Sequence, residues 1–257
     1  MKRLLVLESL KLLPYRSFYI FLALYVISML AVSLLAREVM QRFMVGRGVV
    51  VDPFVLPGLW LYLQVLAGYL NLSLGVLVIN LVCNEWDYRT LRQHVADGLS
   101  RLSVVTGKSL LVALLSGFVT VLIFALGTAL GRWPDTVSST MVWETIEGMG
   151  RFGLQTFGYL SLAMLAGFIL RRTGVATACF VLYILVIEAI VGVLLRRWMQ
   201  GIEQYLPVQV LSGIVESPFN MLSGEPSMLP WVALVLASGY CIAFHLLSYI
   251  IVVRSDL

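Results

Sequence analysis

Charged residues are scarce in this sequence. Only 12% of the 257 residues are Asp, Glu, Lys or Arg, whereas 60% are apolar and the mean hydropathy is +0.94. Because a soluble domain is roughly a quarter charged, this composition excludes a soluble enzyme. A chain of this length also cannot bury several apolar stretches of about twenty residues in its own core. The sequence therefore predicts a membrane protein.

Cysteine and histidine are also scarce, and their spacing excludes the sites usually built from them. Cys83, Cys179 and Cys241 lie in or beside apolar stretches without a CxxC pair, so we interpret them as packing residues. The two histidines form no HExxH pair, and we predict neither a metal site nor a catalytic site. The net charge of +4 comes without a basic run, which indicates loops near anionic lipid and no nucleic-acid partner.

Six apolar stretches are close to or above the roughly 20 residues that cross a bilayer. They cover residues 17–36, 58–83, 109–130, 152–170, 174–195 and 231–252. Each is apolar on every face, whereas membrane-spanning strands alternate polar and apolar residues, so all six are predicted to be helices. The fold class is thus all-α, a polytopic membrane protein whose single transmembrane domain takes up residues 1–257.

The positive charges orient the six predicted spans, because loops rich in Lys and Arg stay in the cytoplasm. With the N-terminus inside, eleven of the 18 Lys and Arg residues face the cytoplasm and seven face the other side. We therefore expect a multi-pass protein of the cytoplasmic (inner) membrane with both termini in the cytoplasm.

Leucines alternate with charged residues at the N-terminus, between Leu4 and Leu13. This pattern favours a short helix in the membrane interface, which Pro14 ends before the first span. The alternative is a plain cytoplasmic extension of that span. Charges interrupt the run too early for a cleaved signal, and we expect the segment to be retained.

The longest cytoplasmic connection, Asn84–Lys108, is the most informative segment. Residues Glu85–Ala96 contain no helix breaker and end before Gly98, which predicts a short helix on the cytoplasmic surface. Ser100 or Ser103 can then cap a second helix that continues into the third span. A charged element between two membrane helices suits contact with a soluble partner, and a merely solvated loop is the alternative.

This segment resembles the family of ABC-2 type permeases, the membrane subunits of ATP-driven exporters. The residues that match the family pattern, in order, are Glu85, Thr90, Leu91, Gly98, Ser100, Arg101, Gly107 and Lys108. The N-terminal interfacial helix and the six-span layout extend the resemblance over nearly the whole chain. One departure is Arg89, where many members have glycine, and it affects how the chain enters the helix.

The resemblance implies a coupling helix over about Asp87–Asp97 that docks on a separate cytoplasmic ATPase subunit. The residues expected to make this contact are Glu85, Asp87, Arg89, Thr90, Leu91, Arg92, Asp97 and Arg101. It also implies a permease homodimer or heterodimer that binds two ATPase copies and carries substrate out of the cell.

The chain itself has no predicted nucleotide site and no predicted cofactor. Gly107-Lys108-Ser109 looks like the end of a P-loop, but Leu102 stands where the motif requires glycine. ATP and Mg²⁺ are therefore expected only on the partner ATPase, and this subunit is not expected to be an enzyme. The rival functions are a membrane anchor or assembly subunit without transport activity and, less favoured, an intramembrane enzyme.

The last external connection, residues 196–230, is too apolar for a free linker. Ile202–Ile214 and Pro218–Leu222 are predicted to form short helices that dip into the bilayer. ABC-2 permeases are similar here, with re-entrant elements that close the outer end of the pathway. An interfacial lid without gating is the alternative.

Glu188 and His245 are the ionisable residues inside predicted spans, which makes both candidates for the transport pathway. Their expected depths differ by roughly 10 Å, so we predict no direct pair. A purely structural role is the alternative for each. Ser238 shares a helix face with His245 but lies about 10.5 Å away along the axis, too far for a serine–histidine nucleophile.

Overall fold

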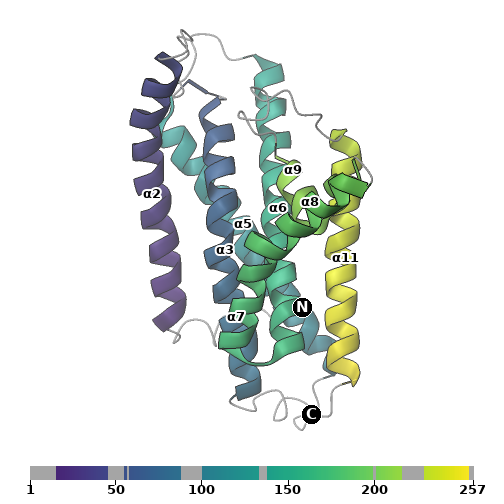
Figure 1. Ribbon diagram of the computed structural model, residues 1–257. Helices are drawn as coiled ribbons and strands as arrows, with labels where there is room; N and C mark the ends of the chain where they lie inside the picture. Colours follow the sequence, from purple (N-terminus) through teal and green to yellow (C-terminus); the bar gives the residue numbers. More distant parts are fainter. Residues whose placement is uncertain are drawn as a thin grey trace.

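The computed structural model describes residues 16–45, 55–56, 58–87, 100–132, 138–198, 201–215 and 229–254. These residues form a helical bundle with no strand among them (Figure 1). Its long helices are α2 (Arg16–Val45), α3 (Gly58–Asp87), α5 (Arg101–Leu130), α6 (Ser139–Leu170) and α11 (Pro230–Arg254). A sixth long helix is divided into α7 (Thr173–Leu182), a π-helical turn η1 (Tyr183–Ile187) and α8 (Glu188–Trp198). Two short elements follow it, the 3₁₀ turn η2 (Glu203–Tyr205) and α9 (Pro207–Gly213).

Six of these helices are long and apolar enough to cross a membrane, which confirms the prediction of a multi-pass, all-helical membrane protein. The predicted N-terminal interfacial helix, the second short helix at 218–222 and most of the coupling helix lie outside the described residues.

Two helices begin well before the predicted spans. α5 begins at Arg101, not at residue 109, and α6 begins at Ser139, not at residue 152. A 32-residue helix is about 48 Å long at roughly 1.5 Å per residue, whereas the hydrocarbon core is about 30 Å thick. The first turns of α6, with Glu144 and Arg151, therefore extend the helix beyond the apolar layer that a hydropathy pattern detects.

The most extensive helix contact joins α3 and α6, which run parallel. The amide of Asn71 donates to the hydroxyl of Thr156 at 3.1 Å, and further along Cys83 Sγ contacts the carbonyl of Gly167 at 3.7 Å. Small residues let these backbones approach, because a Cβ at Gly167 would lie 3.0 Å from Val82. The seam between α3 and α6, defined by these contacts, is the centre of the bundle.

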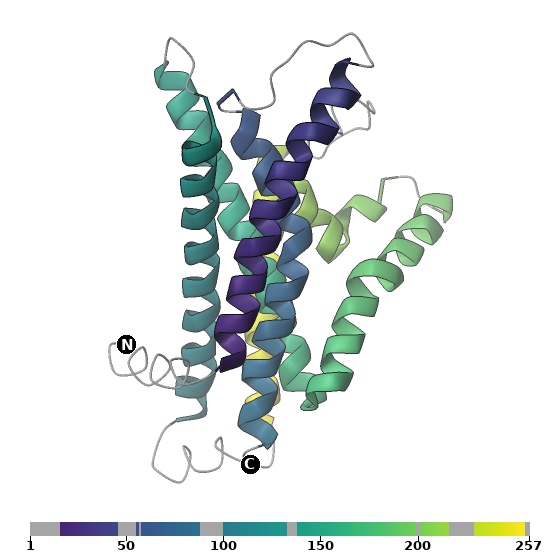
Figure 2. The ribbon, with the colours of Figure 1, turned by 90° about the vertical axis from the view of Figure 1, so that its left-hand side faces the viewer.

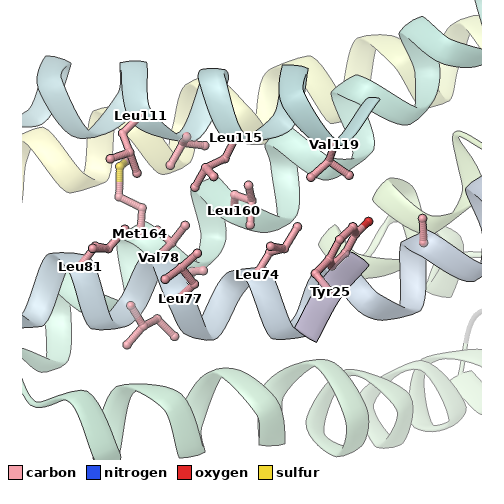
Figure 3. Packing of buried hydrophobic residues seen from close by; sticks show 14 of the residues in the cluster. Tyr25, Leu74, Leu77, Val78, Leu81, Leu111, Leu115, Val119, Leu160 and Met164 are labelled. Atoms are coloured by element: carbon pink, nitrogen blue, oxygen red, sulfur yellow. The ribbon is translucent and has the colours of Figure 1, made fainter. Parts of the chain in front are cut away.

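The apolar core fills the space between α3, α5, α6 and α2 (Figure 3). It is made of large aliphatic side chains that are almost completely buried, and the largest include Leu74, Leu77, Ile79, Ile123 and Leu160. Tyr25 from α2 reaches the same cluster. Because the core draws mainly on these four helices, with Ala176 and Phe180 of α7 and Val252 of α11 added at its edges, it fixes their mutual positions.

Gly127 in α5 and Gly131 at its C-cap form a GxxxG pair where that helix meets the start of α3. A Cβ at Gly127 would lie 2.2 Å from the Trp60 ring, and one at Gly131 would lie 2.7 Å from Leu56. The pair was a weak sequence signal for close helix approach. In the structure, the segment that approaches these glycines is the start of α3 in the same chain.

The helix formed by α7, η1 and α8 slants away from the other long helices (Figure 2). From its far end the chain returns toward the bundle through η2 and α9, whose side chains pack on α6 and α11. α7 is anchored near its C-terminal end by Phe180, whose ring fills the space beside Gly75 of α3, where a Cβ would lie 2.5 Å from it. We call residues 173–215 the slanted unit.

Candidate functional site

A buried ion pair joins α3 and α5 at the two ends of the connection with the family resemblance. Lys108 Nζ lies 2.9 Å from Glu85 Oε1, and the two side chains are only 4% and 9% exposed. Glu85 lies in the last turns of α3, and Lys108 lies in the third turn of α5. The first and last matching residues of the pattern are thus direct neighbours in space.

The start of the expected cytoplasmic helix differs from the prediction. α3 continues without interruption to Asp87, so Glu85 and Asp87 belong to the end of the second span helix. Nothing in the sequence between the apolar stretch and Asp87 stops a helix, since the first glycine is Gly98. Arg89, Thr90, Leu91, Arg92 and Asp97 lie outside the described residues.

Two further contacts surround the ion pair at this end of the bundle. The Arg171 guanidinium lies over the Trp86 ring, 4.3 Å from its centroid, and joins the end of α6 to the end of α3. Arg101, the first residue of α5, donates a hydrogen bond to the carbonyl of Val253 near the end of α11. The Ser100 hydroxyl caps α5 by accepting a hydrogen bond from the backbone N–H of Ser103. Ser100 is one of the two residues that the sequence predicted as this cap. Four helix ends are therefore fixed to one another around the connection.

α9 is packed deep against the bundle. A Cβ at Gly158 would lie 2.3 Å from Leu211, so the leucine of α9 fills a notch in α6. Gly158 precedes the end of α6 by twelve residues, or about 18 Å. α9 thus packs beside the apolar stretch of α6 predicted to be the fourth span, 152–170.

Glu188 holds the start of α9. Its Oε1 accepts a hydrogen bond from the backbone N–H of Gln209 at 2.8 Å, and its side chain is 2% exposed. Nearby, the Tyr240 hydroxyl donates to the carbonyl of Tyr205 at 2.6 Å. A helix start leaves backbone N–H groups without partners, and the buried Glu188 supplies an acceptor for one of them. This contact gives Glu188 a structural task, and its pathway role stays a prediction.

The π-helical turn brings Glu188 to this position. In an uninterrupted α-helix, Ile187 would share the face of Phe180, because seven residues complete nearly two turns. The extra residue of η1 shifts that face to Glu188, which is 2% exposed, whereas Ile187 is 48% exposed. π-turns are frequent at functional sites. The sequence holds no local signal for this turn, and its presence was not predicted.

A charged turn joins the end of α8 to η2. Arg196 Nε donates to Glu203 Oε1 at 3.0 Å, and the Gly201 backbone N–H donates to Glu203 Oε2 at 2.9 Å. The Glu203 carboxyl also accepts from its own backbone N–H, and these bonds together with Arg196 hold its pKa below the ordinary value. The turn therefore favours an ionised Glu203.

His245 packs on α6. Its ring stacks on Phe157 with centroids 5.2 Å apart, and its Nδ1 lies 2.8 Å from the Cys241 carbonyl. Since a carbonyl can only accept, Nδ1 carries a proton. Ser238 donates instead to Leu234 of its own helix, so each side chain of the rejected serine–histidine pair bonds to its own helix backbone. Glu188 and His245 likewise have separate partners.

Buried amides along the seam are polar residues that the prediction missed. Gln64, Asn71 and Gln155 are 4%, 0% and 5% exposed, and the Oδ1 of Asn71 and the Oε1 of Gln155 have no hydrogen-bond partner among the described residues. Gln155 lies beside Gly68, 3.5 Å from the position of its Cβ. The sequence contained a signal for this polar stripe, because Gln64 and Asn71 are seven residues apart and share a helix face.

Within the described part of the chain, no three His, Cys, Asp or Glu residues gather as a metal site would require. The sequence matches no protein-family model, and a search of curated proteins finds no relative.

Proposed function

We propose that this chain is the membrane-spanning permease subunit of an ABC-2 type, ATP-driven exporter, coupled to a separate cytoplasmic ATPase. The observation that carries the proposal is the buried Glu85–Lys108 ion pair. It closes the connection that resembles the coupling segment of that family, and it ties both flanking helices together at its base.

Coupling requires that a push on the cytoplasmic segment reach the transmembrane helices. If the helix ends that flank this segment moved independently, they would absorb the movement. Helix ends that are fixed to one another transmit it. The ion pair, the Arg171–Trp86 contact and the bond from Arg101 to Val253 connect α3, α5, α6 and α11 at this end. This arrangement supports the segment at 88–99 as the site where an ATPase acts.

The element before the last span supports the same function. α9 packs beside the predicted fourth span and is held there by the notch at Gly158 and by Glu188. A short helix in that position, next to the predicted outer end, fits a part that closes a pathway. We expect two copies of the bundle, as a homodimer or with a related chain, to enclose that pathway.

Co-purification tests the proposal. Tagged full-length protein is isolated from its native membranes in mild detergent, and ATP hydrolysis is measured in the purified sample. Arg92→Glu and Asp97→Lys reverse charges in the coupling segment and should each remove most of the associated ATPase activity, because complementary charge guides such docking. Arg196→Glu makes the same charge reversal in the turn after α8 and serves as the matched control.

The wild type and the Arg196→Glu variant should both retain the ATPase. A wild-type preparation without ATPase would favour the anchor function instead. Full activity in both coupling variants would contradict the assignment of the contact to this segment.

Topology is tested by labelling. In a background without Cys83, Cys179 and Cys241, single cysteines replace the exposed residues Leu102 and Ser139, which avoids the capping serines beside them. A membrane-impermeant reagent added to intact cells should modify the cysteine at 139 and spare the one at 102. The reverse result would overturn the cytoplasmic placement of the coupling segment.

A further inference from the structure

A cavity of about 220 Å³ lies between the N-terminal parts of α3 and α6, beside the end of α9. It belongs neither to the coupling segment nor to the Glu188 contact. Five of its lining residues are polar or charged: Gln64, Glu144, Thr145, Glu147 and Arg151. Polar groups converging on one cavity are typical of a ligand site.

The charges of this cavity favour a cation. Arg151 forms an ion pair with Glu147 one turn away, so these two charges offset each other. None of the described residues forms an ion pair with Glu144, which also lines the cavity. The three charged groups therefore leave a net charge of −1 at its wall.

The carbonyl oxygen of the Gln64 side chain can accept a hydrogen bond from a ligand. Its side chain is 4% exposed, and among the described residues its one hydrogen bond is a long contact from Nε2 to Met149 Sδ, at 3.6 Å. The carbonyl oxygen of this amide thus receives no donor from the described residues. This oxygen is not among the fully buried polar atoms without a partner, so it borders open space, where a ligand or a water can donate to it.

The remaining side chains that line the cavity are apolar and favour a ligand with a short apolar chain. Trp60, Leu61 and Val215 line the cavity, and Trp60 is fixed by a stacked ring contact with Phe124 at 5.4 Å between centroids. The cavity is smaller than the roughly 300–1,000 Å³ of sites for drug-sized ligands. It can hold a small group but not a large molecule.

We propose that this cavity binds a primary ammonium group carried on a short apolar chain. The ammonium donates to the Gln64 carbonyl and faces the Glu144 carboxylate, while the chain lies against Trp60 and Leu61. The ligand is a free alkylamine or the ethanolamine headgroup of a lipid, which share this chemistry. The site does not depend on the function as an exporter.

Calorimetric titration of the full-length protein in phosphatidylcholine nanodiscs tests the proposal, with butylammonium as the probe. Butanol lacks the charge and tetramethylammonium lacks the N–H donor, so both should bind at least about tenfold more weakly. Gln64→Leu and Glu144→Gln should each weaken butylammonium by about tenfold or more. Gln155→Leu, a buried glutamine of the same seam outside the cavity, should not.

A second arm separates the two sources. If nanodiscs containing phosphatidylethanolamine reduce butylammonium binding in the wild type, the lipid headgroup competes for the site, and if they do not, the free amine is the ligand. Absence of butylammonium binding would overturn the proposal. Equal binding of butanol, or unchanged binding in both cavity variants that fold like the wild type by circular dichroism, would overturn it as well.

Discussion

The seam helix α6 and the slanted helix α7–η1–α8 are buried to very different extents. In their most apolar windows, 61% of the α6 residues are buried in the protein, but only 11% of those in the slanted helix. Yet the slanted helix is the more apolar of the two. Apolar character therefore brings a helix into the bilayer, but it does not bring the helix to its neighbours, because lipid covers an apolar face as well as protein does. Small and polar residues are what bring one helix to another.

The two regions are also held differently. The seam is a continuous contact along α3 and α6, with amides, glycines and aliphatic side chains in turn. The slanted unit is held at fewer places: by Phe180 beside Gly75, by Glu188 on Gln209, and by the small apolar cluster of α9 on α6 and α11, which includes Leu211 beside Gly158. Loss of one contact should therefore loosen one part of the slanted unit. Damage to the frame, the name we give to α2, α3, α5, α6 and α11 together, should instead lower the stability of the whole bundle.

The largest effect is expected from Lys108→Met in the frame. Removing the ammonium breaks a buried ion pair and leaves the Glu85 carboxylate without this cation, at a cost of about 3–5 kcal/mol. Unfolding of the purified protein in detergent, followed by circular dichroism, measures it. The double variant Glu85→Gln with Lys108→Met is the control and should recover much of the loss. A double variant as unstable as the single one would contradict the buried charge as the cause.

A matched pair of leucines tests the comparison directly. Leu160 lies in the frame and Leu211 in α9, and both are completely buried. Each substitution by alanine removes the same atoms, at a cost of about 2–5 kcal/mol where the site cannot collapse. Leu160→Ala should lower the global unfolding midpoint. Leu211→Ala should instead speed hydrogen exchange in α9, toward the lower end of that range, with little change in the midpoint.

Equal loss of global stability in both leucine variants would break the distinction between frame and slanted unit. It would show that α9 unfolds only together with the bundle. Mass spectrometry resolves the exchange peptide by peptide, so the two outcomes are separable in one experiment.

The sequence predicted the six spans because each is an apolar stretch of sufficient length. It placed the start of α6 too late, because helices continue past the bilayer where hydropathy falls. For α5 the apolar stretch begins only at residue 109, but Ser100 was one of the two predicted caps of a helix leading into it. The short α9 falls within the predicted Ile202–Ile214 segment. Its position was suggested by composition alone and depends on the contact between Leu211 and Gly158, 53 positions apart in the sequence.

The candidate sites were predictable to different degrees. Glu188 was found because an isolated acid in an apolar stretch is costly. Its partner was not, because a backbone N–H carries no sequence signature, and the π-helical turn that directs it arises from packing. Glu85 and Lys108 were named separately from the family pattern, and only the fold makes them a pair.

A smaller effect is expected at Glu188. Glu188→Ala removes the acceptor for the Gln209 N–H, and a buried donor without a partner costs about 1–3 kcal/mol. Glu188→Gln keeps a carbonyl oxygen in place and should cost less than about 1 kcal/mol. Hydrogen exchange of the Gln209 amide compares them. If the glutamine variant exchanges as fast as the alanine variant, the charge of Glu188 matters beyond this bond.

The Glu188→Gln variant also separates the two roles proposed for this acid. With α9 intact, a purely structural acid leaves transport-coupled ATP hydrolysis at the wild-type level. A pathway acid, which must ionise, leaves an assembled complex with reduced coupled hydrolysis. Wild-type coupling in Glu188→Gln would end the pathway role.

The smallest effect concerns pH at the turn after α8. The pKa of Glu203 is lowered from 4.5 by the bonds from its own N–H, from Gly201 and from Arg196, so the turn gains stability from the ionised carboxylate. That contribution is present above the unfolded-state pKa and is lost as the pH falls through the lowered folded-state pKa. Because the pair is at the surface, only local loosening is expected. Corrected for its intrinsic pH dependence, exchange in residues 201–206 should speed up below pH 4.5 in the wild type. Glu203→Gln should already be loose at neutral pH and show no such change. A wild-type turn that stays equally protected in acid would contradict the role of the carboxylate.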